Sequence, residues 1–199
     1  MSTAHAMPAG LPELVHAGQQ TFRAVLDALA RPGQIRHIGA ALPEVRLGGA
    51  TARLLLSLCD DETQVWWQTP DTHLQSWLQF HTGARVAPDP QVASFALLND
   101  PETSPALADF AMGSADAPEF STTLFIELPA LQGGVELEWR GPGIQDVQRV
   151  GLVGVPSSFW TQWQANHAAF PRGVDIVFTC GEHAMGLPRS TRVRRLEGV

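Results

Sequence analysis

The sequence predicts an α/β protein built on a mixed β-sheet flanked by helices. Amphipathic helical patterns alternate with short runs rich in β-branched and aromatic residues along most of the chain. Residues 135–139 alternate strictly between apolar and polar side chains, which is typical of an antiparallel strand with one face toward solvent. The 199 residues, of which 44% are hydrophobic, contain no repeat and no linker-like stretch, so we expect one domain over residues 1–199.

The elements expected in the first half of the chain have clear boundaries. A helix over residues 13–30 is ended by Arg31-Pro32-Gly33, and a second helix spans residues 49–59. Residues 34–38 and 64–67 are predicted strands, and Asp71 is the expected N-cap of a helix that ends near Gly83. The first helix is expected to bury a single apolar stripe, made of Val15, Phe22, Val25, Leu26 and Leu29.

The middle of the chain predicts a strand over residues 92–98 and a helix over residues 101–111. Residues 121–128 and 135–139 are predicted to form a β-hairpin through Gly133-Gly134. Another turn, at Gly141-Pro142-Gly143, precedes a strand over residues 147–153. The sheet is therefore expected to be mixed.

The segment from residue 155 to residue 192 organises the functional argument. Pro156 opens a helix that Ser157 or Ser158 can cap, Pro171 ends it, and Gly173 reverses the chain into a strand over residues 174–180. A polar, arginine-rich segment follows. The apolar face of the helix is expected to consist of Phe159, Trp163 and Phe170.

Charge is unevenly distributed. The net charge is −7, yet residues 172–199 carry five Arg against three carboxylates, and every basic residue of the chain is Arg. The guanidinium group presents a planar fork of donors that matches phosphate and carboxylate. A local anion contact is therefore expected, with a solvated arginine-rich edge as the alternative, and the acidic remainder argues against a nucleic-acid binder.

Several familiar chemistries are excluded. Without Lys the chain can hold neither a Walker-type phosphate loop nor a pyridoxal phosphate (PLP) Schiff base. Cys180 and His183 have ligand-like spacing, but no second close pair accompanies them, so no metal is expected.

Two cysteines make no disulfide framework, and neither a signal peptide nor a membrane span is recognisable, so we expect a cytoplasmic protein.

Two further polar features have simple structural interpretations. His81 ends the helix that Asp71 opens, where an imidazolium interacts favourably with the helix dipole, with general acid/base chemistry as the alternative. Asp27 and Arg31 are four residues apart on one predicted helix, a spacing that favours an ion pair.

An ordered set of motifs resembles the PhnH family, the H subunit of the bacterial carbon-phosphorus lyase system. The resemblance spans about residues 14–195, with Ser190 where Thr is expected and Leu26 and Leu29 where Met is common. The motifs are Phe22-Arg23-Ala24, residues 27–33, Phe80-His81-Thr82-Gly83, Gly141-Pro142-Gly143-Ile144, the aromatic and polar residues of 159–175, and residues 187–193.

The resemblance implies a fold like the large domain of PLP-dependent transferases, without PLP or any other cofactor, and a homodimer. It implies that the chain works with G, I and L subunits to join a phosphonate to the ribose of ATP, displacing adenine, and sits with G, I and J subunits in a core complex. The family's catalytic residues are not established, so none is assigned. The chain is not expected to be catalytic alone.

The residues that we expect to contact phosphonate, phosphate or nucleotide are Asn166, Arg172, Arg189 and Thr191, with Asp175 orienting an Arg. Arg192 and His81 complete the candidate set. Arg forks can neutralise the charge that builds up when a phosphonate attacks the ribose of a polyphosphate. Two alternatives remain: these residues serve subunit docking only, or the chain is a free-standing small-anion-binding transferase.

Overall fold

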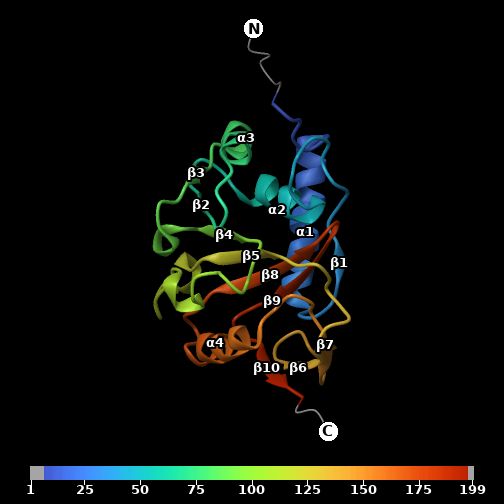
Figure 1. Cartoon of the computed structure of the whole chain (residues 1–199), viewed down its shortest axis with the longest axis vertical. Coiled ribbons are helices and arrows are strands. Elements are labelled where there is room, and N and C mark those ends of the chain that lie inside the picture. Colours follow the sequence, from blue (N-terminus) through green and yellow to red (C-terminus); the bar gives the residue numbers. More distant parts are fainter. Residues whose placement is uncertain (1–6, 197–199) are drawn as a thin grey trace.

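A seven-stranded mixed sheet, with helices on both faces, forms the centre of the molecule (Figure 1). The computed structural model describes residues 7–196. The strands lie in the order β1-β9-β8-β5-β4-β2-β3; the five from β8 to β3 are parallel, whereas β9 and β1 are antiparallel to their neighbours. Their bounds are β1 Arg36–His37, β2 Gln64–Trp67, β3 Arg85–Val86, β4 Phe95–Leu98, β5 Thr123–Glu127, β8 Asp175–Cys180 and β9 His183–Leu187.

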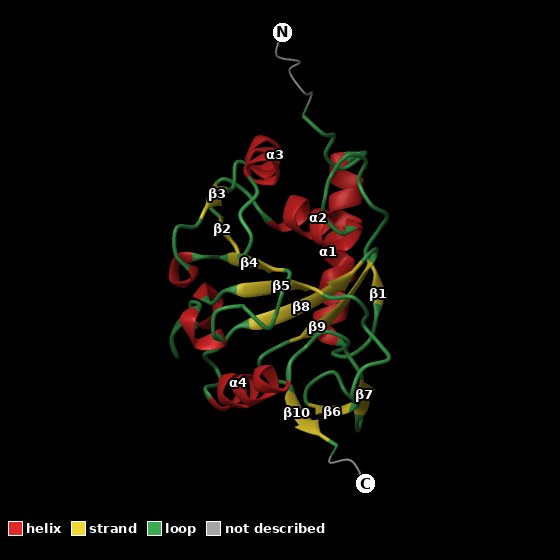
Figure 2. Cartoon of the chain, viewed as in Figure 1, coloured by secondary structure: helices red, strands yellow, loops and turns green. Residues whose placement is uncertain are grey.

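The two faces of this sheet are covered by different elements (Figure 2). Helices α1 (Leu14–Ala30), α2 (Gly49–Leu58) and α3 (Thr72–Thr82) share one apolar core with side chains of the sheet. Helix α4 (Ser157–Ala168) and a three-stranded sheet, β10-β6-β7, share the other. Residues along β5 alternate between these cores, with Phe125 in the first and Leu124 and Ile126 in the second. The expected α/β class is confirmed.

Most helix boundaries agree with the sequence prediction. Asp71 caps α3, its Oδ1 accepting hydrogen bonds from the backbone N–H of His73 at 2.8 Å and of Leu74 at 3.2 Å. Gly83 ends that helix with a φ of 81°, a conformation in which a Cβ is strained. For α4 the prediction of a serine cap is wrong, because the N-cap residue is Pro156 and no side chain caps the helix.

The predicted helix over residues 101–111 does not form. The segment is a series of turns with one short 3-10 helix, Leu107–Asp109. The Asp100 side chain accepts from the backbone N–H of Glu102, and Pro105 has no N–H to donate, so local turns replace the helical ladder. Leu107 and Phe110 are nevertheless buried, which fixes the segment against the core.

The predicted hairpin through Gly133-Gly134 is also wrong. β5 lies between β4 and β8 in the large sheet, whereas β6 (Leu137–Arg140) pairs in the small sheet with β7 (Gln148–Val150) and β10 (Arg192–Arg195). The hairpin that does form joins β6 to β7 through Gly141-Pro142-Gly143. The alternation expected along β6 holds, since Leu137 and Trp139 are buried.

Two apolar predictions hold only in part. On α1 the predicted stripe is divided, with Val25 buried but Val15, Phe22 and Leu26 exposed. On α4 Phe159 and Trp163 are buried, whereas Phe170, beyond the helix end, is exposed.

The arginine-rich segment after Cys180 contains β9 and β10, which the sequence did not predict.

Candidate functional site

The predicted arginine site is an internal hydrogen-bond cluster centred on Arg189. The Asp175 carboxylate accepts from the backbone N–H of Arg189 at 2.7 Å and from its Nε at 3.1 Å. Nη1 donates to the backbone oxygens of Pro118 at 3.0 Å and Pro171 at 3.3 Å, and Nη2 donates to Asp175 and to the Ser121 hydroxyl. A guanidinium has five N–H groups, and each has a protein acceptor here.

Asn166 and Thr191 lie in the interior beside this cluster. The buried Asn166 amide brackets Val174, donating to its carbonyl at 3.0 Å and accepting from its N–H at 2.8 Å. Thr191 is buried, and its backbone oxygen accepts from the Trp163 indole N–H at 3.0 Å. These contacts join α4 to the start of β8 and to the turn before β10.

The other candidates lie apart. The side chains of Arg172 and Arg192 are exposed and form no ion pair with any of residues 7–196. His81 is on α3, at the opposite end of the molecule from α4 (Figure 1), and its Nε2 lies 2.9 Å from the backbone oxygen of Pro8. The expected pair of Asp27 and Arg31 forms, and Arg36 joins it.

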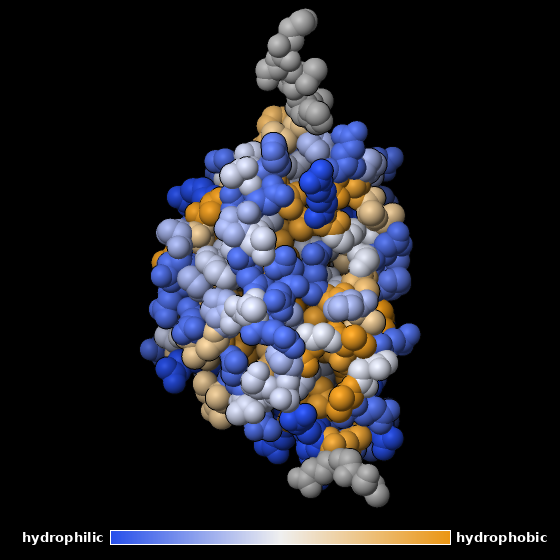
Figure 3. Space-filling view, viewed as in Figure 1, coloured by the Kyte–Doolittle hydropathy of each residue, from blue (hydrophilic) through white to orange (hydrophobic). Residues whose placement is uncertain are grey.

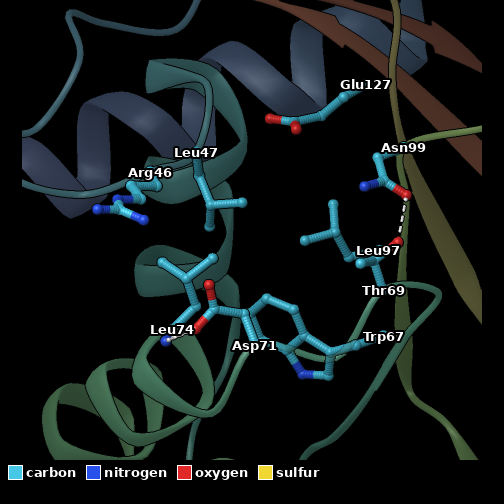
Figure 4. Close-up of a pocket in the computed structure, with 9 residues that line it drawn as sticks. All are labelled: Arg46, Leu47, Trp67, Thr69, Asp71, Leu74, Leu97, Asn99 and Glu127. Atoms are coloured by element: carbon cyan, nitrogen blue, oxygen red, sulfur yellow. Dashed lines mark hydrogen bonds between the residues drawn. The ribbon is translucent and has the colours of Figure 1, made fainter.

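A pocket of about 180 Å³ opens at the carboxyl ends of the parallel strands β2, β4 and β5 (Figure 4). Trp67 and Glu127 are the last residues of β2 and β5, and Asn99 follows β4. The segment before α2 and the start of α3 complete the walls. The lining residues are Arg46, Leu47, Trp67, Thr69, Asp71, Leu74, Leu97, Asn99 and Glu127.

Topology explains why a pocket forms at this place. The chain runs from β2 through α3 to β3 on one side, and then returns past β2 to β4 on the other side. The loops that leave β2 and β4 therefore diverge, which leaves a crevice above the carboxyl ends of these strands. Ligands of open α/β sheets characteristically bind at such a switch point.

Two carboxylates face this cavity, each with one oxygen already in use. Oε1 of Glu127 accepts from the backbone N–H of Gly48 at 2.9 Å, and Oδ1 of Asp71 caps α3. Within the described part of the chain, neither Oε2 of Glu127 nor Oδ2 of Asp71 has a hydrogen-bond donor. Figure 4 shows the two carboxylates on different walls, with the Trp67 ring on the same side as Asp71 in this view and Arg46 at the rim.

Sequence reasoning missed this pocket. Asp71 was recognised only as a helix cap, and the other lining residues were not considered as site residues. The available clue was positional, because Thr69, Asn99 and Glu127 all lie within two residues of the ends of predicted strands, where parallel strands present ligand-binding loops. Among residues 7–196 no group of three His, Cys, Asp or Glu side chains could hold a metal ion, and no helix could span a membrane.

Comparison with known proteins gives a family match over almost the whole chain. Residues 9–194 match the family model described as bacterial phosphonate metabolism protein (PhnH). The chain is 39% identical over 184 residues to the alpha-D-ribose 1-methylphosphonate 5-triphosphate synthase subunit PhnH of Rhizobium meliloti, covering 91% of this chain and 92% of that protein. It is 28% identical over 179 residues to HtxG of Stutzerimonas stutzeri, a candidate C-P lyase subunit, covering 88% and 85% of the two chains.

Proposed function

The chain belongs to the PhnH family of bacterial phosphonate metabolism proteins, and from this premise we propose that it is a subunit of a ribose 1-methylphosphonate 5-triphosphate synthase. It works with G, I and L subunits to convert ATP and an alkylphosphonate to ribose 1-alkylphosphonate 5-triphosphate and adenine. With G, I and J subunits it forms a core complex, and it is not catalytic alone. Family membership and the relative's name support this assignment.

An exposed apolar stripe on α1 carries the argument for assembly. Val15, Phe22 and Leu26 are 74%, 46% and 49% exposed, and their i, i+7, i+11 spacing places them on one helix face. Other apolar side chains reach the surface shown in Figure 3 in patches separated by hydrophilic residues. Exposed apolar side chains that share one helix face favour an interaction surface, and two copies related by a twofold axis can cover each other's stripe. We therefore assign it to a homodimer contact.

We propose that the exposed arginines make the anion contact that the sequence led us to expect. Arg172 and Arg192 present free guanidinium forks, which suit either a phosphonate or acidic side chains of a partner subunit. Arg189 has no N–H left for a ligand, so its role in this proposal is to hold Asp175 and the loop at Pro118 and Pro171 in place. In this proposal the arginine that Asp175 orients is Arg189.

Three further expectations, about domain organisation, location and fold, belong to the same proposal. The chain is a single domain, it resides in the cytoplasm, and its fold corresponds to the large domain of PLP-dependent transferases. With no Lys in the sequence it cannot form the Schiff base that PLP enzymes require, so it is proposed to work without a cofactor.

Affinity purification from cells grown on a phosphonate as the sole phosphorus source tests the proposal. The tagged chain is expected to bring down the other subunits in fixed proportions, and its deletion is expected to abolish growth on phosphonate but not on phosphate. The alternative, a free-standing small-anion-binding transferase, predicts that the chain purifies without partners and turns over ATP and alkylphosphonate by itself. That result would refute the subunit assignment.

A further inference from the structure

We propose that the pocket at the carboxyl ends of β2, β4 and β5 binds the ribose of a sugar phosphate, with the phosphate at Arg46. This inference rests on the proposed function only for the identity of the sugar phosphate, the ribose and polyphosphate portion of ATP. The geometric case is independent of the family match, since it depends on the two carboxylates, the Trp67 ring and the free arginine.

The unused carboxylate oxygens define the chemistry of the ligand. Oε2 of Glu127 and Oδ2 of Asp71 are acceptors without a donor among the described residues, and both side chains are half-buried. A ligand that fills the space between them must therefore present hydrogen-bond donors. Vicinal hydroxyl groups do this without bringing a charge into the pocket, and an acidic residue at a strand end is the group that holds ribose hydroxyls in nucleotide-binding α/β folds.

The rest of the lining fits a small ring with one apolar face. Leu47, Leu74 and Leu97 provide apolar walls beside Trp67. A volume of about 180 Å³ is below the roughly 300 Å³ at which pockets for drug-sized molecules begin, so it suits one ring rather than a whole nucleotide. The base would then remain outside the cavity, where a partner subunit can reach it.

Arg46 sets the orientation of the sugar. Its side chain is exposed at the pocket rim and forms no ion pair within residues 7–196. Phosphate is repelled by Glu127 and Asp71 but is matched by a guanidinium fork, so the phosphate end lies at the rim and the hydroxyl groups lie inside. The Asn99 amide, whose Oδ1 accepts from Thr69 at 3.1 Å, keeps its N–H groups for the ligand.

Calorimetric titration of the purified full-length chain with ribose 5-phosphate tests the inference, with EDTA present so that no metal can bridge the carboxylates. Ribose 5-phosphate is expected to bind, and 2-deoxyribose 5-phosphate is expected to bind more weakly. Glu127→Gln and Asp71→Asn keep the oxygen that accepts from Gly48 or caps α3, but convert the free oxygen into a donor. Each should weaken binding about tenfold or more, because a hydrogen bond to a charged group is lost.

Asp89→Asn is the matched control. Asp89 also caps a short helix through Oδ1, and it lies outside the pocket, so the same loss of charge should leave binding unchanged. Absence of ribose 5-phosphate binding would overturn the inference, as would equal weakening by all three variants. Tighter binding of a phosphate-bearing primary amine of similar size would also overturn it, because the carboxylates would then serve a cation.

The experiments distinguish failure of the pocket assignment from failure of the proposed function. If the pocket variants bind ribose 5-phosphate as wild type does, while the chain still co-purifies with its partners and supports growth on phosphonate, only the pocket assignment falls. If the pure chain binds ribose 5-phosphate but neither joins other subunits nor supports that growth, the subunit assignment falls and the pocket stands.

Discussion

Asp175 holds both the backbone and the side chain of Arg189, so one carboxylate fixes the start of β8 to the turn that follows β9. The Arg189 side chain is only 12% exposed, which makes this pair largely desolvated. Replacing Arg189 by Ala leaves a half-buried carboxylate without its cation, and we expect the free energy of unfolding to fall by about 3 kcal/mol or more. Urea denaturation measures this change.

The control for this prediction is Arg172→Ala. Its side chain is exposed and unpaired within the described residues, so a change of less than about 0.5 kcal/mol is expected. If Arg189→Ala unfolds at the wild-type urea concentration, the interpretation of Arg189 as a structural residue is wrong.

Asn166 supports a second structural prediction. Its amide supplies both hydrogen bonds of the Val174 backbone, in a buried position between α4 and β8. Asn166→Ala should destabilise the protein by about 2–5 kcal/mol, because two buried backbone groups lose their partners. Gln164→Ala, an exposed substitution on the same helix, is the control, and equal melting temperatures for the two variants would contradict the prediction.

The thiol of Cys59 predicts a loss of stability at alkaline pH. Burial raises the pKa of this thiol from 9.0 to about 12, so the folded protein keeps a proton that the unfolded chain releases. The stabilisation is complete below pH 9 and is lost as the pH rises toward 12, by about 1.4 kcal/mol per pH unit. The chain has no Lys and no Tyr, so few other side chains titrate in this window.

Urea denaturation between pH 9 and pH 12, in a Cys180→Ala background, isolates the effect. Cys59→Ala should remove most of the pH dependence, whereas an unchanged slope would show that another group is responsible. In the native protein Cys59 should also resist alkylation at pH 8, because the thiolate is the reactive form.

The apolar stripe on α1 predicts a change of assembly without a loss of folding. Phe22→Glu places a charge in the middle of the proposed dimer contact and should convert the dimer to a monomer in light scattering. Circular dichroism should remain that of wild type. Phe80→Glu, at an exposed position on α3, should leave the molecular mass unchanged, and a monomeric wild-type protein would refute the assignment.

The sequence predicted the elements whose boundaries are set by local chemistry. Asp71 and Gly83 delimit α3 because each end satisfies free backbone groups within the segment itself. The strand at residues 64–67 was recognised from its composition alone. The failures are non-local: β6 leaves the large sheet because β10, more than fifty positions later, pairs with it, and no nearby residue indicates this partner.

The candidate site could also be predicted only in part. Asp175 accepts hydrogen bonds from Arg189, but the sequence could not reveal that Arg189 has all its donors occupied, since three of its acceptors are Pro118, Ser121 and Pro171. The pocket could not be predicted from the sequence for a similar reason. Arg46, Asp71 and Glu127 are distant in the chain, and only the reversal of strand order at β2 and β4 places them around one cavity.

The position of β8 has a consequence for biosynthesis. This strand lies between β5 and β9, and β1 joins the sheet only through β9, although β1 is made early and β9 very late. A ribosome must therefore extend the nascent polypeptide through Leu187 before the large sheet can close. Until β8 has been made, the β5 edge is open to other chains, and products terminated before Asp175 should depend on chaperones to escape aggregation.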